Sequence, residues 1–371
     1  MTNTLVIYSY YQKNDEYVKN FEFFLKFGIY PDIDYIFCIN GRECSITIPN
    51  LPNIKIIERD NIGFDFGSYY DAIKTIDINA YKYFFFINTS VRGPFLPDNI
   101  RSNIKWTQPF IELLKGDVKL VGTSINIFNI KNGNTQDYLN NQITKPLIDL
   151  GYQPPFPHVQ SQMFLLNNES LNYLLSENFF NISTDNNFDK TIALREVLMS
   201  LLILKKGWNI NCILDKYKNL DYRTIKEDIN HTSVGGDSYY TGAYFGNSIK
   251  PYDVIFIKTN RGVSTKEIIE LTDGYYIYDS HPTNYIEPFD NINSPSNNTI
   301  SEVHTEFYNL RLWHLVFILF IVFLVIVIVL YLIKYINQKP MSGGRKKNIS
   351  GGRSCACYGG RSSKNNLTKR N

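Results

Sequence analysis

The chain has 371 residues, of which 44% are hydrophobic, and its formal net charge at pH 7 is only +3. A chain of this length can bury a large core, and the near-neutral charge gives no indication of a specific nucleic acid as partner. The 5 cysteines are too few for a disulfide framework. We expect Cys38 and Cys212, which lie in apolar runs, to be core residues.

Strand-like and helix-like segments alternate over the first hundred residues. Apolar runs at 4–10, 35–40, 54–59 and 81–88 predict strands, and apolar residues recur at helical spacing over 17–25. The run at 81–88 is almost continuously apolar, as in a strand covered on both faces. This order predicts an α/β fold with a doubly wound, mostly parallel sheet.

The second half continues with mixed elements. A broad apolar face predicts a helix over 191–206, and the apolar run at 253–261 predicts the last strand of the domain. From residue 272 the chain becomes rich in Asn, Ser, Pro and Tyr, which we interpret as a stalk.

The run Leu315–Ile333 contains no charged residue. A helix of about 19 residues rises roughly 28 Å, close to the hydrocarbon thickness of a bilayer, and Trp313 and Tyr331 stand near its ends, where aromatic rings favour the interface. The Gly-rich basic tail that follows predicts disorder. We therefore expect a domain at 1–271, a linker at 272–311, a transmembrane helix at 312–333 and a disordered tail at 334–371.

The sequence leaves open the side of the membrane on which the domain lies. The basic tail favours a cytosolic C-terminus and an outside domain, because positive residues stay inside. The first residues, however, show no apolar stretch behind a basic start, so they predict no cleavable signal peptide. The prediction is a single-pass membrane protein whose partner is the lipid bilayer.

The first polar cluster, NIGFDFGS at 61–68, follows the third predicted strand, and ligands of open α/β sheets bind where strands end. Gly63 and Gly67 permit positive φ and close backbone approach. We expect Ser68 to cap a helix whose N-terminus favours a diphosphate. Asp65 would accept a ribose or sugar hydroxyl; the alternative is a helix-capping turn with no ligand.

The second polar cluster, NTSVRGPF at 88–95, follows the fourth predicted strand. Small polar groups followed by Arg, Gly and Pro predict a shaped rim. Arg92 is predicted to bind phosphate through its forked guanidinium. The alternative is that Arg92 pairs with a carboxylate of the core, such as Asp65.

The two clusters together resemble glycosyltransferases related to rhamnan-synthesis protein F, which occur in algae and large DNA viruses. The resemblance rests on N-x-G-x-D-x-G-S-Y, an apolar strand, and F-x-N-T-S-V-R-G-P-F. It covers roughly Leu5 to Arg261 and continues at His158–Phe164, at Glu196 with Ser200, at Gly207–Ile210 and at Val254–Thr259. It implies a GT-A-like fold that binds a nucleotide-sugar donor.

The resemblance also implies residue roles. Glu196 would be the base that takes the acceptor's proton, with Asp65 as a second catalytic carboxylate; the alternative is a solvated helix Glu. His158 would contact acceptor or phosphate, or be structural, and Lys258 would face the same site or be a surface charge. The predicted donor-binding residues are Asn61, Gly63, Asp65, Gly67, Ser68, Asn88, Ser90, Arg92, His158 and Lys258.

One departure from the family concerns the metal. GT-A enzymes typically carry Asp-x-Asp after this strand to hold Mg²⁺ or Mn²⁺, whereas this chain has Asn88-Thr89-Ser90. Arg92 or Lys258 would neutralise the diphosphate instead, or Asp65 would be a lone acidic ligand. The sequence thus predicts a membrane-anchored glycosyltransferase acting on a glycan or protein. The alternatives are an inactive glycan- or nucleotide-binding module and a structural membrane protein.

Overall fold

The computed structural model describes residues 3–129, 141–182, 184 and 186–279. They include a seven-stranded sheet with the strand order β10-β6-β9-β4-β1-β2-β3. Its strands are β1 (Thr4–Tyr11), β2 (Asp34–Asn40), β3 (Ile54–Arg59), β4 (Tyr83–Asn88), β6 (Val118–Gly122), β9 (Met163–Asn167) and β10 (Asn209–Cys212). All neighbouring pairs are parallel except those of β9, which runs antiparallel to β4 and β6. The predicted α/β class with a mostly parallel sheet is confirmed.

Two short antiparallel ribbons complete the strands: β5 (Val91–Arg92) with β11 (Ile257–Lys258), and β7 (Ile125–Phe128) with β8 (Phe156–Val159). The α-helices are α1 (Asp15–Phe27), α2 (Phe64–Ile73), α3 (Asp98–Arg101), α4 (Gln108–Leu113), α6 (Thr144–Asp149), α7 (Asn168–Ser176), α8 (Phe188–Thr191), α9 (Leu198–Lys205), α10 (Pro251–Val254) and α11 (Thr265–Asp279). A π-helical segment, η4 (Ile192–Val197), joins α8 to α9, and short turns lie at Ile78–Ala80, Phe179–Asn181 and Asp215–Tyr217.

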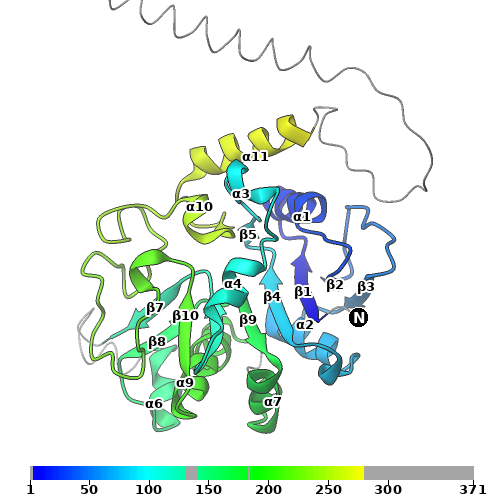
Figure 1. Ribbon diagram of the computed structural model, residues 1–371. Helices are drawn as coiled ribbons and strands as arrows, with labels where there is room; N and C mark the ends of the chain where they lie inside the picture. The colour runs from blue at the N-terminus through cyan, green and yellow to red at the C-terminus, as the bar shows by residue number, and fades with distance from the viewer. Residues whose placement is uncertain (1–2, 130–140, 183, 185, 280–371) are drawn as a thin grey trace, which may run out of the picture. The chain divides into compact units, whose positions relative to one another are not determined.

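Helices cover both faces of the sheet. Figure 1 shows α1, α3 and α11 on one side of it and α2, α7 and α9 on the other. Aromatic side chains fill both layers: Tyr8 lies 4.9 Å from Phe21 of α1, measured between ring centroids, and Phe86 stacks on Phe164 at 4.7 Å on the opposite face. Cys38 and Cys212 are fully buried, as predicted.

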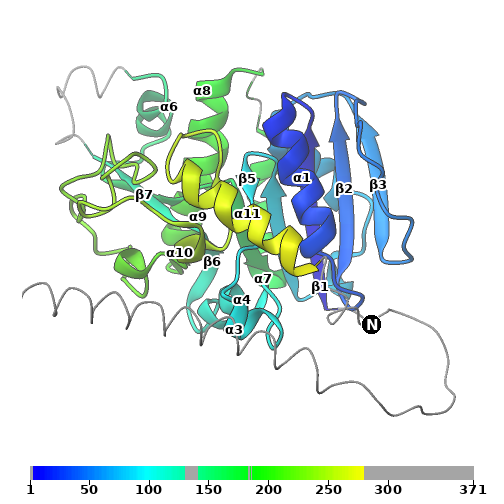
Figure 2. The same cartoon turned by 90° about the horizontal axis from the view of Figure 1, so that it is seen from above.

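The C-terminal helix of the described chain differs from the prediction of a stalk. In Figure 2, α11 runs diagonally across the layer that contains α1. Tyr275 of α11 lies 5.3 Å from Phe23, measured between ring centroids, and its hydroxyl donates to Leu96 O at 2.8 Å. The helix therefore continues to Asp279, beyond the predicted domain boundary at 271.

Two predicted elements are corrected by local chemistry. The segment 253–261 was predicted as one strand, but Pro251 at the first helical turn and the Asp253 carboxylate, which accepts the Lys250 N–H at 2.8 Å, begin α10. Only Ile257–Lys258 of that segment is extended. The helix predicted over 191–206 contains the π-helical turn η4 before α9 begins.

The predicted transmembrane helix at 312–333 and the basic tail lie outside the described residues. Among residues that the structure describes, no helix has the length and apolar character needed to cross a bilayer.

Candidate functional site

The carboxyl ends of the parallel strands meet at one edge of the sheet, where β9 begins. The first polar cluster follows β3 and the second follows β4, so both predicted clusters lie at this edge. In a parallel α/β sheet this is where ligands bind.

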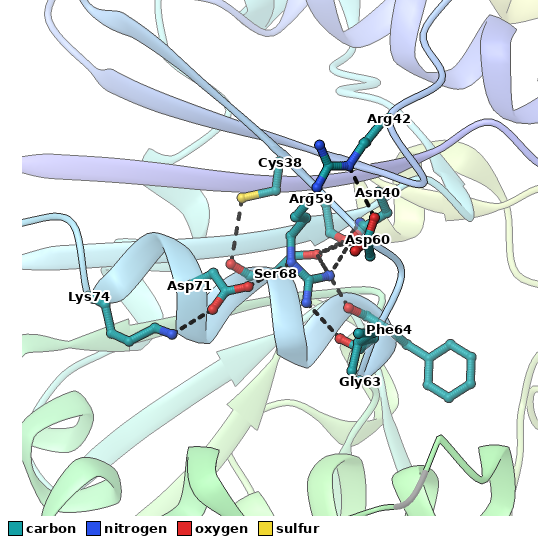
Figure 3. Close-up of polar contacts among 12 residues, drawn as sticks. Cys38, Asn40, Arg42, Arg59, Asp60, Gly63, Phe64, Ser68, Asp71 and Lys74 are labelled. Atoms are coloured by element: carbon teal, nitrogen blue, oxygen red, sulfur yellow. Dashed lines mark hydrogen bonds and ion pairs between the residues drawn. The ribbon is translucent and has the colours of Figure 1, made fainter.

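Arg59 at the end of β3 holds the loop that enters α2 (Figure 3). Its guanidinium donates to Ile62 O at 2.6 Å and to Asp71 Oδ2 at 2.8 Å, and it also bonds the side-chain oxygen of Asn40. These bonds tie the loop both to β2 and to α2. The resemblance did not single out Arg59, because an Arg at the end of an exposed strand looks like an ordinary surface residue in the sequence.

The two glycines of the first cluster are required by the backbone. Gly63 has φ +72°, and a Cβ at Gly67 would lie 2.1 Å from Ile62 O. Asn61, just before them, is partly exposed. The glycines therefore let the loop fold tightly onto the first turn of α2.

The prediction that Ser68 caps this helix is wrong. Helix α2 begins at Phe64, and no side chain caps it. Ser68 lies in its second turn and is fully buried, and its hydroxyl donates to Asn40 Oδ1 at 2.8 Å and accepts from Ser9 at 3.0 Å. Its hydroxyl holds α2 against β1 and β2 and is not presented to a ligand.

Asp65, in the first turn of α2, meets the end of β4. The Asn88 side-chain amide donates to Asp65 Oδ2 at 2.8 Å, while Asn88 Oδ1 accepts from the backbone N–H and the hydroxyl of Ser90 at 3.0 and 2.6 Å. Burial raises the pKa of Asp65 to about 6, and the negative charge of Glu196 acts in the same direction. The two predicted clusters are therefore joined through Asp65 and Asn88.

Arg92 does not join this site, which corrects the prediction that it binds phosphate. Its guanidinium donates to Asn20 Oδ1 at 3.0 Å, to Thr272 Oγ1 at 3.3 Å and to Glu16 Oε1 at 2.8 Å. The side chain is 3% exposed, and its carboxylate partner is Glu16 rather than Asp65. Arg92 thus fastens β5 to α1 and α11.

We expect Arg92→Met to destabilise the fold by about 3 kcal/mol, because it leaves the buried Asn20 oxygen without a donor and removes the guanidinium bonds that fasten β5 to α1 and α11. Urea unfolding measures this. The matched variant Glu16→Gln removes only the half-exposed partner and should cost less than about 1 kcal/mol. Equal costs for the two variants would contradict the structural role of Arg92.

Lys258 reaches the same edge from the far end of the described chain. Its strand pairs with β5, with Lys258 opposite Val91, and Thr259 N donates to Ser90 O at 3.0 Å. Asn20 fixes this junction, because its amide donates at 2.8 Å both to Thr89 O and to Thr259 Oγ1. Lys258 therefore lies directly beside the second polar cluster.

The Lys258 ammonium is a buried cation without an ion pair. The residue is 9% exposed, and in the described part of the chain its ammonium forms no hydrogen bond or salt bridge. It lies 5.4 Å from the ring centroid of Tyr239. Burial lowers the pKa of Lys258, against the raising effect of the carboxylates of Asp237, Glu196 and Asp65. A buried, unpaired cation is a group that an anionic ligand would stabilise.

Glu196 lies on the π-helical segment η4 and is held from one side. Its Oε2 accepts from the backbone N–H of Ser161 at 2.7 Å and from the Ser161 hydroxyl at 2.6 Å. Its Oε1 lies 3.9 Å from His158 Nε2 and accepts no hydrogen bond within the described residues. The side chain is 16% exposed, so one carboxylate oxygen is oriented and available.

His158 is fully buried, as its structural alternative predicts. Its Nδ1 lies 2.9 Å from Phe156 O, and its Nε2 has no hydrogen-bond partner. Burial lowers the pKa of His158, so the ring is neutral at pH 7. With Nδ1 donating to the carbonyl, Nε2 is left as an acceptor facing Glu196.

Asp237 is a site residue that the sequence analysis missed. It accepts from Gln160 Nε2 at 3.3 Å and from Arg261 Nη2 at 3.4 Å, and its negative charge acts to raise the pKa of Lys258. Asp237 belongs to a Gly-Gly-Asp turn in a Tyr-rich segment, and this short sequence formed no motif that the sequence analysis could use. The polar run at 160–162, inside an otherwise apolar stretch, was the signal that could have pointed to this contact.

We call Asp65, Glu196, Asp237 and Lys258 the charged cluster. A divalent metal fits it poorly, because the groups that follow β4 are an amide and two hydroxyls and Asp65 is already held by Asn88. Within the described residues no three His, Cys, Asp or Glu side chains are grouped to hold a metal ion.

Comparisons with known proteins return structures but no sequence family. No family model and no curated protein matches the chain. A search of solved structures finds glycosyltransferases, of which three are described here. The bifunctional glycosyltransferase WbbM is 10% identical, with a TM-score of 0.29, over 56% of this chain and 37% of WbbM. The chain thus spans just over a third of WbbM.

The galactosyltransferase LgtC, solved with donor and acceptor sugar analogues, is 12% identical over 52% of this chain and 71% of its own, with a TM-score of 0.29. A glycosyltransferase involved in glycosylation of the major capsid of PBCV-1 is 9% identical over 52% of this chain and 75% of its own, with a TM-score of 0.27. At such TM-scores the function has to be argued from the residues of the site.

Proposed function

We propose that this chain is a glycosyltransferase that moves a sugar from a nucleotide-sugar donor to a glycan or protein acceptor. The observation that carries the proposal is the buried, unpaired ammonium of Lys258 at the carboxyl edge of the sheet, among three carboxylates. A diphosphate would supply the charge that Lys258 lacks, and the carboxylates suit the hydroxyls of ribose and sugar and the acceptor's proton.

Different residues of the site suit different parts of the donor. Asp65 lies beside Asn88 at the end of β4, whereas Glu196 lies beside Ser161 and His158. We assign a ribose hydroxyl to Asp65, the diphosphate to Lys258, and the sugar to the side of Glu196 and Asp237. Asn88 donates to the Asp65 carboxylate and holds it in place, and Ser90 in turn holds Asn88.

The transfer step follows from this placement. The acceptor oxygen forms a bond to the anomeric carbon while the bond from that carbon to the diphosphate oxygen breaks. Glu196 Oε1, the oxygen left free by Ser161, takes the proton of the acceptor hydroxyl. Lys258 stabilises the negative charge that develops on the leaving diphosphate.

The test is a search for turnover by the purified chain. Nucleotide-sugars of several bases and sugars are incubated with glycan acceptors, and release of nucleoside diphosphate is measured. Release by the native protein that is lost in Glu196→Gln, with folding intact, supports the proposal. A protein that binds nucleoside diphosphate but releases none with any donor would instead be an inactive binding module, which the missing Asp-x-Asp pair favours.

We also propose that a single helix at 312–333 holds the enzyme at a membrane. The support is the uncharged run Leu315–Ile333 and its flanking aromatic residues. Extraction of cell membranes at alkaline pH should leave the full-length chain in the pellet. Its complete release into the supernatant would contradict the anchor.

A further inference from the structure

The ribbon formed by β7 and β8 has an apolar face and a polar face. Ile125, Ile127 and Val159 belong to the hydrophobic core. The opposite face carries Asn126 and His158, which pair in the register and are almost fully buried, together with Phe128 and Phe156. A buried polar face on a short ribbon requires partners.

Several of these buried polar atoms have none. Within the described residues, Asn126 Oδ1, His158 Nε2 and Gln162 Oε1 have no hydrogen-bond partner. Orphaned polar groups of this kind are uncommon in folded proteins, because each costs free energy. Three such acceptors on and beside one ribbon leave places for the hydrogen-bond donors of a ligand.

The orphaned atoms belong to one neighbourhood. Gln162 donates to Thr123 Oγ1 at 2.7 Å and to Ser124 Oγ at 3.3 Å, and these are the groups that surround the Tyr239 hydroxyl. The Lys258 ammonium lies over the Tyr239 ring. His158 Nε2 faces Glu196 at 3.9 Å. The neighbourhood therefore adjoins the charged cluster on its sugar side.

The chemistry of the orphaned atoms selects a ligand class. Two are amide oxygens and one is a neutral imidazole nitrogen, so all three are acceptors, and the Tyr239 hydroxyl can serve either way. Acceptors need a ligand that donates. Hydroxyl groups donate, whereas carboxylate and phosphate groups do not, and the nearby carboxylates of Glu196 and Asp237 repel an anion.

We propose that Asn126, His158, Gln162 and Tyr239 form the sugar subsite of the donor site and take an uncharged sugar ring through its hydroxyl donors. This inference rests on the proposed function and adds the residues and the class of sugar.

The segment Gly235–Tyr240 supplies Asp237 and Tyr239 to this neighbourhood. Ile127 N donates to Gly236 O at 3.2 Å, and Asp237 is held by Gln160 at 3.3 Å and by Arg261 at 3.4 Å. Ser238 of the same segment bonds the Tyr217 hydroxyl at 3.0 Å and the Asn230 amide at 3.1 Å. These contacts fix the segment beside the β7–β8 ribbon.

The test compares nucleotide with nucleotide-sugar on the full chain by titration calorimetry. UDP, GDP and dTDP are each titrated alone and as their uncharged hexose conjugates, and the ratio of the two dissociation constants measures the contribution of the sugar. Asn126→Leu and Gln162→Met should each reduce this ratio about fivefold to tenfold and leave nucleotide affinity unchanged. Asn209→Leu is the matched control, because its amide is fully paired in β10, and it should leave the ratio unchanged.

A second experiment uses only the native protein. Donors in which single sugar hydroxyls are replaced by fluorine, which cannot donate, should bind the native protein more weakly at two or more ring positions. If every fluorinated donor binds as tightly as its parent while nucleotide affinity persists, the orphaned atoms hold only water and this inference fails alone. If no nucleotide binds at all, the proposed function fails with it.

Discussion

Lys258→Met should weaken binding of nucleoside diphosphate by about 10- to 100-fold, because a charge-assisted hydrogen bond contributes roughly 1.5–3 kcal/mol. The same variant should unfold at an unchanged or higher urea concentration. Burial lowers the pKa of Lys258, which shows that the native environment disfavours its charge. Removing that charge at nearly constant volume relieves the penalty.

Lys119→Met provides the control. Lys119 is also largely buried, with its side chain 16% exposed, but its ammonium pairs with Glu169 at 2.7 Å. Its replacement should lower stability and leave nucleotide affinity intact. If Lys258 is the diphosphate ligand, calorimetry should show lower nucleotide affinity only for Lys258→Met, and urea unfolding should show lower stability only for Lys119→Met. Loss of stability without loss of affinity in Lys258→Met would remove Lys258 from the site.

Asp65→Asn should impair the enzyme and strengthen the fold. The burial that raises the pKa of Asp65 to about 6 makes its charged form costly at neutral pH. Neutral Asn avoids this cost, so we expect the free energy of unfolding at pH 7.5 to rise by about 2 kcal/mol. Donor affinity should fall about 10-fold or more, because a charged acceptor of the ribose hydroxyl is lost.

The sign of the pH dependence checks the cause. The folded pKa of Asp65 lies above the unfolded value of 3.8, so the folded state binds the proton more tightly. The stability that this proton provides is complete below about pH 4 and is lost as the pH rises through about 6. The stability gained by Asp65→Asn over the native protein should therefore grow across this window and stay constant above it.

Asp71→Asn, on the same helix, should show the opposite trend. Burial raises the pKa of Asp71, but the hydrogen bonds from Lys74 and Arg59 outweigh it and leave the pKa lowered. Its charge therefore stabilises the fold at neutral pH, and this contribution is lost as the pH falls through the lowered value. Urea midpoints between pH 3 and 8 for both variants measure the two trends. Parallel curves would contradict the assignment for Asp65.

The sheet could be predicted from sequence because its signals are local. Continuous apolar runs such as 81–88 mark strands covered on both faces, and the segment between β1 and β2 has a helical period. The strand predicted at 253–261 failed because the apolar run Val254–Ile257 suits either structure, and the capping carboxylate of Asp253 decided it. A run this short does not distinguish a strand from a helical turn.

The site could be predicted only in part. Pairing of Arg92 with Asp65 was offered as an alternative, but the two clusters meet through Asp65 and Asn88. Side chains alternate along a strand, and sequence does not show which side of the two-residue strand β5 carries Arg92. Asp237 was missed because the contacts that place it, to Gln160 and Arg261, are distant along the chain.

The junction made by Asn20 has a consequence for biosynthesis. One amide joins Thr89 near the beginning of the described chain to Thr259 near its end. During translation the central strands can pair long before residue 259 leaves the ribosome, but the proposed donor site stays incomplete until then, because domains fold as their sequence emerges. A nascent chain that stops short of β11 would thus carry much of the sheet and lack its ligand for the diphosphate.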